Sequence, residues 1–109
     1  MSYVEESFRR LTIGDHAFEA LTAPRPGSPL PSLDGRTEAL VRLAALIAVD
    51  APAGSYRATV DAAQRNGARE EDLLAVIRGV AEIVGTARVV SAAPRIALAA
   101  GYDVEAALE

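Results

Sequence analysis

Residues 40–49 read LVRLAALIAV, and Arg42 is the only charged residue in this run. A helix with so little polar surface is expected to be buried on most sides, either within its own chain or between subunits. Glu38 lies four residues before Arg42, so this pair marks the one edge expected to face water. Asp34 or Thr37 can begin the helix, because either side chain can accept a hydrogen bond from a first-turn N–H group. The run therefore predicts the central helix of the fold.

The central helix ends at a break that reads VDAPAGS, residues 49–55. Its proline and glycine both disfavour a continuous helix. The residues that follow, 55–66, have the periodicity of a second helix, which Gly67 is expected to close. One face of this second helix carries Tyr56, Thr59, Val60 and Ala63.

Residues 70–72 are three consecutive acids, which favour the first turn of a helix because the helix dipole is positive there. We predict one long helix from Glu70 to Ser91 or Ala93, ended or kinked by Pro94. A last helix would follow and end at Gly101. No segment alternates with the period of two that strands require, so we predict an all-α helical bundle.

The N-terminal part of the chain predicts two shorter helices. Ser2 and Glu5 have the spacing of a capping box, which begins a helix that extends to about Leu11. Asp15 can cap a second helix over HAFEAL, residues 16–21.

Four of the six prolines lie in residues 23–33, APRPGSPLPSL, which are therefore expected to be non-helical. This segment suggests an N-terminal helical arm over residues 1–22, a Pro-rich linker over 23–33 and a helical domain over 34–109. The length of 109 residues fits one domain overall. The tail after Gly101 could add a turn capped by Asp103.

Composition excludes several classes of function. The chain has no Cys, no Lys and a single His, which removes disulfides, thiol redox chemistry, lysine Schiff bases and a multi-histidine metal site. We expect no metal and no cofactor. All 11 basic residues are Arg and are scattered over a chain of net charge −4, so no nucleic-acid partner is expected. The chain has no signal-like or membrane-spanning run, so we expect a cytoplasmic protein without membrane contact.

Two residues of the predicted long helix are candidates for a site. Arg88 lies in an apolar stripe, and burying an unpaired guanidinium costs several kcal/mol, so it should meet a carboxylate, a bound anion or a subunit boundary, or else reach the surface. Glu82 can act as a general acid or base if a neighbouring subunit covers it. The alternative for Glu82 is an exposed ion pair with Arg78. Gly85, one turn beyond Glu82, is expected to permit close helix packing.

Other candidates lie on the shorter helices. The hydroxyls of Tyr56 and Thr59 can face a pocket, although Tyr56 also suits the core with its hydroxyl at the edge. His16 is the natural proton shuttle of this chain or an ordinary surface histidine.

Two stretches, LDGRTEALVRLAALIAVDAP from residue 33 and TVDAAQRNGAREEDLLAVIRGVAEIVGTARVVSAA from residue 59, resemble the carboxymuconolactone decarboxylase family. This family includes the alkylhydroperoxidase D-like proteins. The features that carry the resemblance are LDGRT before a buried helix, NGA followed by acids, and the apolar helix that contains Gly85. The resemblance implies an all-helical domain that assembles through its helices into homotrimers or homohexamers.

The catalytic residues of that family are absent from the matching positions. In the peroxidase branch, a Cys-x-x-Cys and a histidine four residues later are expected where this chain has Pro52, Ser55 and Thr59. In the decarboxylase branch, the resemblance implies a histidine at the position of Thr59. The glutamate that the family usually carries at the start of the buried helix corresponds to Ala39 in this chain, and Glu38 lies one position before it. An alcohol does not ionise usefully at neutral pH and forms no disulfide, so Ser and Thr cannot replace a peroxidatic thiolate.

The sequence therefore predicts a family member without cysteine-dependent peroxidase activity, most simply an oligomeric binding or assembly module. The alternative is a cofactor-free enzyme, of decarboxylase or lactone type, acting on a small organic anion. For that alternative, Glu82 and Thr59 are the candidate catalytic residues. Its candidate substrate-binding residues are Arg88, Tyr56 and Ser55.

Overall fold

The computed structural model describes residues 2–14 and 32–102. The chain divides into two units, residues 1–32 and 33–109. Within the described part of the first unit lies the helix α1 (Tyr3–Ile13). The Oγ atom of Ser2 accepts a hydrogen bond of 3.1 Å from the N–H of Glu5, which confirms the predicted N-cap. The predicted helix over 16–21, His16 and the predicted turn at 103 lie outside the described residues.

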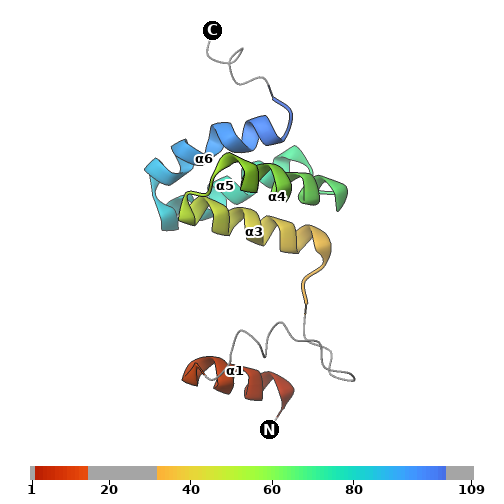
Figure 1. The fold of residues 1–109 in the computed structure, drawn as a ribbon, viewed down its shortest axis with the longest axis vertical. Coiled ribbons are helices and arrows are strands. Elements are labelled where there is room, and N and C mark those ends of the chain that lie inside the picture. Colours follow the sequence, from red (N-terminus) through yellow and green to blue (C-terminus); the bar gives the residue numbers. More distant parts are fainter. Residues whose placement is uncertain (1, 15–31, 103–109) are drawn as a thin grey trace. The chain divides into compact units, whose positions relative to one another are not determined.

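The second unit is built from α3 (Gly35–Val49), α4 (Ala53–Arg65), α5 (Glu70–Val84) and α6 (Thr86–Ala99). All the regular elements that the structure describes are helices, as the sequence predicted. Consecutive helices run in roughly opposite directions, so the end of α3 and the start of α4 lie at the same end of the unit as the turn between α5 and α6 (Figure 1). Helix α3 packs against all three of the others, and α6 packs against α4 and α5 as well.

The core consists mainly of small and aliphatic side chains, as expected for a chain rich in alanine. Its largest fully buried side chains are Tyr56, Leu43, Ile47 and Val60. The complete set of buried residues comprises Ala39, Leu43, Ile47, Ala51, Tyr56, Val60, Ala63, Ala68, Leu73, Ala92 and Ile96.

Helix α3 begins where the sequence predicted. The Oδ1 atom of Asp34 accepts a hydrogen bond of 2.8 Å from the N–H of Thr37. Its buried residues, Ala39, Leu43 and Ile47, recur every fourth position and form a single stripe. The other sides of this apolar helix are half-buried or exposed in the single chain.

The break between α3 and α4 is a tight turn. Asp50 closes α3 in the left-handed conformation, with φ of 53°. The N–H of Ala51 donates to the carbonyl of Leu46 at 3.0 Å. Pro52 is then the extended N-cap residue of α4. At the other end, Gly67 follows the C-cap residue of α4 with a positive φ of 89°, as predicted.

The predicted long helix from Glu70 to Ser91 or Ala93 is wrong. The chain turns at Gly85, which has φ of 88° and ψ of 161°, and this conformation ends α5 and precedes α6. Glycine occupies this region of backbone space without the steric penalty that a Cβ atom brings. Gly85 is therefore a hinge between two helices and does not lie inside one.

The predicted helix boundary at Pro94 is also wrong. Pro94 does not separate two helices but lies inside α6. Proline lacks an N–H group, so α6 continues past it with one backbone hydrogen bond fewer. Gly101, with φ of 98°, follows the end of α6 as predicted.

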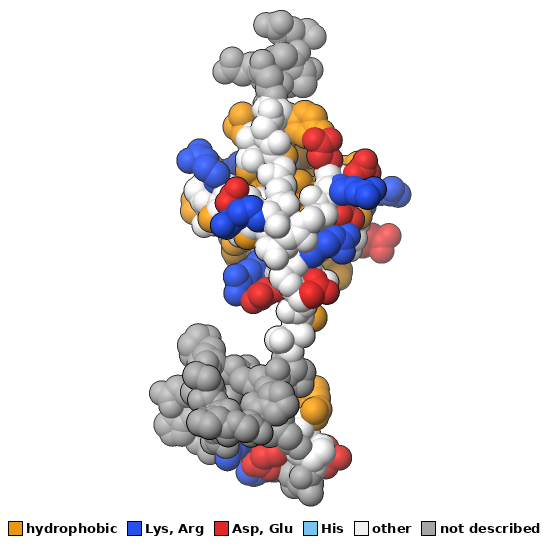
Figure 2. Space-filling model, turned by 90° about the vertical axis from the view of Figure 1, so that its right-hand side faces the viewer, with side chains coloured by type: hydrophobic (Ala, Val, Ile, Leu, Met, Phe, Trp, Pro, Cys, Tyr) orange, Lys and Arg blue, Asp and Glu red, His pale blue; other side chains and the backbone are white. Residues whose placement is uncertain are grey.

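Charged groups hold the ends of the helices. Arg36 at the start of α3 forms an ion pair of 2.7 Å with Asp72, which also accepts a hydrogen bond from the N–H of Arg69 at the start of α5. These two contacts lower the pKa of Asp72, the bond from Arg69 being the larger cause. The face drawn in Figure 2 carries Arg, Asp and Glu side chains interspersed across the helical unit. Among the described residues, no helix has the combined length and apolar character needed to cross a bilayer.

Candidate functional site

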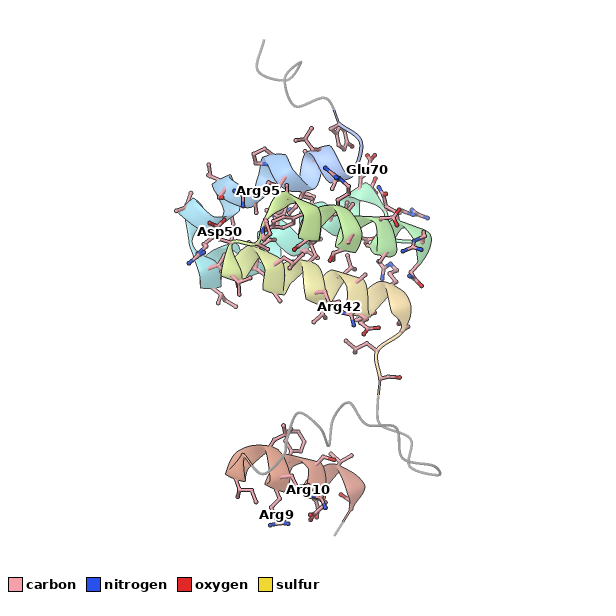
Figure 3. The ribbon with its side chains drawn as sticks, in the orientation of Figure 1. Arg9, Arg10, Arg42, Asp50, Glu70 and Arg95 are labelled. Atoms are coloured by element: carbon pink, nitrogen blue, oxygen red, sulfur yellow. The ribbon has the colours of Figure 1, made fainter. Side chains whose placement is uncertain are left out.

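A polar cluster lies at the break between α3 and α4. The hydroxyl of Ser91 donates a hydrogen bond of 2.8 Å to Oδ1 of Asp50. The Nη1 atom of Arg95 lies 3.3 Å from the same oxygen and donates a hydrogen bond of 2.8 Å to the carbonyl of Ala51. Figure 3 shows Asp50 at the end of α3 and Arg95 on α6, close together at this end of the unit. The cluster therefore joins the turn to α6.

Local structure explains why these side chains meet. Ser91 and Arg95 are four residues apart on α6, so they lie on the same face of the helix. The side chains of Arg95 and Asp50 are 36% and 41% exposed, so solvent can reach both. A guanidinium, a carboxylate and a hydroxyl thus occupy one partly accessible site.

Tyr56 lies in the core near this cluster. Its side chain is fully buried, and its hydroxyl has no hydrogen-bond partner among the described residues. Burial raises the pKa of Tyr56, while the charge of Arg95 lowers it and that of Asp50 raises it. The hydroxyl therefore remains protonated at neutral pH and available as a donor.

A pocket of about 240 Å³ lies between α3 and α4. Thr59 is half-buried in its lining, which also contains the ion pair of Glu38 and Arg42. In this pair, Nη2 of Arg42 lies 2.8 Å from Oε1 of Glu38. The pocket is lined by Gly35, Glu38, Ala39, Arg42, Ala58, Thr59, Ala62 and Asn66. It brings a hydroxyl, an amide and an ion pair to one small hollow.

Gly35 permits the close approach of α3 and α4 beside this pocket. A Cβ atom on Gly35 would lie 2.3 Å from Oδ1 of Asn66. The side chain of Asn66 is itself held in place, because its Nδ2 atom donates a hydrogen bond of 2.8 Å to the carbonyl of Ala62.

Residues 16–99 match the model of the carboxymuconolactone decarboxylase family. The chain belongs to this family. The match includes the whole of α3, α4, α5 and α6, and so contains the break and both polar groups of residues just described. No curated protein and no solved structure matches the chain.

The structure places the five candidate residues of this family member in different surroundings. Thr59 lines the pocket between α3 and α4, and Ser55 is half-buried on the first turn of α4. Tyr56 is a core residue. Glu82 and Arg88 are exposed on either side of the hinge at Gly85, and neither lines the pocket between α3 and α4. The single chain therefore does not gather the five into one site.

Two expectations about these charged residues change. Arg88 was expected within one continuous apolar stripe, but the hinge at Gly85 divides the stripe, and Arg88 is exposed. It therefore avoids the cost of burial within the single chain. Glu82 and Arg78, both among the described residues, form no ion pair. The roles of Arg88 and Glu82 in ligand binding or catalysis stay predictions.

The polar cluster at the break was not predicted from the sequence. The available signal was the spacing of Ser91 and Arg95, two polar residues four apart in a largely apolar helix. Their partner Asp50 lies more than 40 residues earlier, and only the packing of α6 against the turn brings it near. The described residues contain no group of three or more acidic or histidine side chains that could hold a metal ion.

Proposed function

We propose that this member of the carboxymuconolactone decarboxylase family is a non-redox, homo-oligomeric binding module that assembles through the exposed apolar side of α3. The observation that carries the proposal is the burial pattern of this helix. Val41 and Val49 are 53% and 69% exposed, and Ala45 and Ala48 are exposed as well. A helix that is apolar nearly all round has thus only one stripe buried within its own chain.

The exposed side of α3 has the form of a helix-packing surface. Val41, Ala45 and Ala48 are spaced by four and three residues, so they lie in one row along the helix. Small side chains let a second helix approach closely, and covering apolar surface removes it from water. The resemblance implies homotrimers or homohexamers, which agrees with a surface of this kind.

The non-redox part of the proposal rests on chemistry. The chain has no cysteine, so it has no thiolate to reduce a peroxide and no dithiol to form a disulfide. Ser55 and Thr59 carry hydroxyls, which support binding and hydrogen bonding but not thiol redox cycles.

Light scattering on the full chain tests the assembly. One chain has a mass of 11.4 kDa, and we expect the wild type to have three or six times this mass. Ala45→Glu places a charge in the row on α3, where covering it would cost several kcal/mol, so this variant should have the mass of one chain.

Gln64→Glu is the matched control, because it adds the same charge at an exposed position on α4 and should leave the assembly intact. Circular dichroism checks that each variant stays helical. A wild type with the mass of one chain would exclude the proposal. An Ala45→Glu variant of unchanged mass would exclude α3 as the interface.

A second candidate function is a cofactor-free enzyme acting on a small organic anion. The polar cluster favours it, because a carboxylate, a hydroxyl and a guanidinium meet at the break. In this candidate Arg88 orients the anion, and Glu82 or Thr59 assists proton transfer. A neighbouring subunit would have to complete the site, since Arg88 and Glu82 are exposed in the single chain. Turnover of small lactones or carboxylic acids, followed by proton NMR, should then fall in Ala45→Glu and in either Glu82→Gln or Thr59→Val. Turnover equal to that of the wild type in all three variants contradicts this candidate function.

A further inference from the structure

A separate pocket lies between α4 and α6 and is lined by two arginines. Its volume is about 200 Å³, and its lining consists of Ala53, Arg57, Arg95, Leu98 and Ala99. No acidic residue is among the described residues that line it. Two guanidinium groups that face one hollow repel each other, so an anion between them is favoured.

Arg95 is already fixed in the position that such an anion needs. Its Nη1 atom donates to the carbonyl of Ala51 and contacts Asp50, so the side chain is held at the mouth of the turn. A guanidinium has five N–H donors, and the remaining donors of Arg95 have no partner among the described residues. A held guanidinium loses little conformational entropy when it binds a ligand.

Arg57 supplies a second charge that its own surroundings leave uncompensated. It forms no hydrogen bond or ion pair with any residue that the structure describes, and it is exposed. The first turn of α4 contains no acidic residue, and Pro52 gives it no side-chain cap. The positive end of the helix dipole thus adds to the charge of Arg57, while Asp50 partly offsets the charge of Arg95.

The rest of the pocket is apolar. Leu98, which is largely exposed, and the methyl groups of Ala53 and Ala99 make up the rest of its lining. We propose that this pocket binds a small aliphatic monocarboxylate, with its carboxylate between Arg57 and Arg95 and its alkyl chain against Leu98. Planar guanidinium groups match a carboxylate with paired hydrogen bonds, and the alkyl chain covers the exposed leucine.

This site names a ligand class for the proposed binding module, but it does not depend on assembly through α3. Neither arginine lies on α3, so a failure of the light-scattering test leaves the pocket untouched. Conversely, a chain that assembles as proposed can still fail to bind a carboxylate.

Titration of the full chain with sodium butyrate, followed by amide chemical shifts in ¹⁵N NMR spectra, tests the site. We expect saturable shifts at Ala53, Arg57, Arg95 and Leu98, and binding of acetate weaker by at least threefold, because acetate lacks the alkyl chain. Arg57→Gln should weaken butyrate binding at least fivefold. Arg65→Gln, which makes the same change on the exposed side of the same helix, should leave it unchanged within twofold.

Any of four results would overturn the proposal. Butyrate could produce no saturable shifts at these residues, or Arg57→Gln and Arg65→Gln could bind it equally well. Inorganic phosphate could bind more tightly than butyrate, which would indicate an anion site without the apolar complement.

Arg95→Lys keeps the positive charge but removes the planar guanidinium, so it tests geometry separately from charge. Its affinity for butyrate should lie between those of the wild type and Arg57→Gln. An affinity equal to that of the wild type contradicts a carboxylate paired with the guanidinium.

Discussion

Tyr56 combines a well-packed ring with an unpaired hydroxyl. The ring is fully buried beside Leu43 and Ile47 in the same core, but the hydroxyl has no hydrogen-bond partner among the described residues. An unsatisfied buried hydroxyl costs about 1–3 kcal/mol relative to its hydrated state. This residue therefore stabilises the fold through its ring and opposes it through its oxygen.

Replacing this hydroxyl with hydrogen should stabilise the domain. We expect Tyr56→Phe to raise the free energy of unfolding by roughly 1 kcal/mol in urea denaturation at neutral pH, because the ring stays and the unpaired group goes. A loss of stability would mean that the hydroxyl has a partner after all.

The same substitution should change the alkaline stability. Burial raises the pKa of Tyr56 above the ordinary value of 10.0, so above that pH the unfolded chain releases the proton first. The stability that the neutral phenol gives is complete below about pH 10 and is lost as the pH rises through the folded-state pKa. Tyr102, whose pKa is raised by its hydrogen bond to Glu70, remains in both proteins. Unfolding curves at pH 9 and pH 11 should therefore diverge more for the wild type than for Tyr56→Phe.

At the level of the elements, the hinge at Gly85 determines the fold of the C-terminal half. It reverses the chain so that α6 packs on α3, α4 and α5. A Cβ atom on Gly85 would meet no other atom within 4 Å, so the need for glycine lies in the backbone conformation alone. Gly79, inside α5, also has free space around it but has no positive φ.

These two glycines give a matched pair of substitutions. Gly85→Ala should destabilise the domain by about 1–3 kcal/mol, because a side chain disfavours its φ and ψ values. Gly79→Ala should stabilise it by about 0.4–1 kcal/mol, because alanine restricts the unfolded chain and favours a helix. Urea denaturation of both variants checks the signs, and a stabilised Gly85→Ala would contradict the hinge.

The starts of the helices could be predicted from sequence because they depend on neighbouring residues. Ser2 and Asp34 cap helices through contacts three residues away. The hinge could not be predicted, since helical periodicity continues across Gly85 and a glycine is tolerated within a helix. The packing of α6 on helices that are distant in the sequence determines that the chain turns at Gly85.

The candidate site likewise has parts that the sequence could indicate and parts that depend on the packing of distant helices. The resemblance put Thr59 at the position of the family's histidine, and Thr59 lines the pocket between α3 and α4. The contacts of Asp50 with Ser91 and Arg95 span 41 and 45 residues, so no local pattern specifies them.

At the scale of the whole molecule, the chain has more large apolar side chains than its described residues bury. Half of the residues are hydrophobic, yet many large ones remain exposed in the described parts of the chain. The exposed residues of the second unit include Val41, Val49, Leu74, Ile83, Val90 and Leu98. A small domain has a high ratio of surface to volume, and the assembly proposed above would cover Val41 and Val49.

The composition of the whole chain also sets a limit on its chemistry. With no cysteine, the purified protein should consume hydrogen peroxide in the presence of dithiothreitol no faster than a protein-free control. The rate is measured from the remaining peroxide. Consumption that scales with protein concentration would mean that the chain reduces peroxide by another route.

The contact between Gly35 and Asn66 links how these two positions can change as sequences diverge. Any residue with a Cβ atom at position 35 would displace the Asn66 side chain, and so break its hydrogen bond to Ala62. A larger residue at position 35 is therefore compatible with a shorter one at position 66. In relatives that share this helix pair, the two positions should vary together, although 31 positions separate them along the chain.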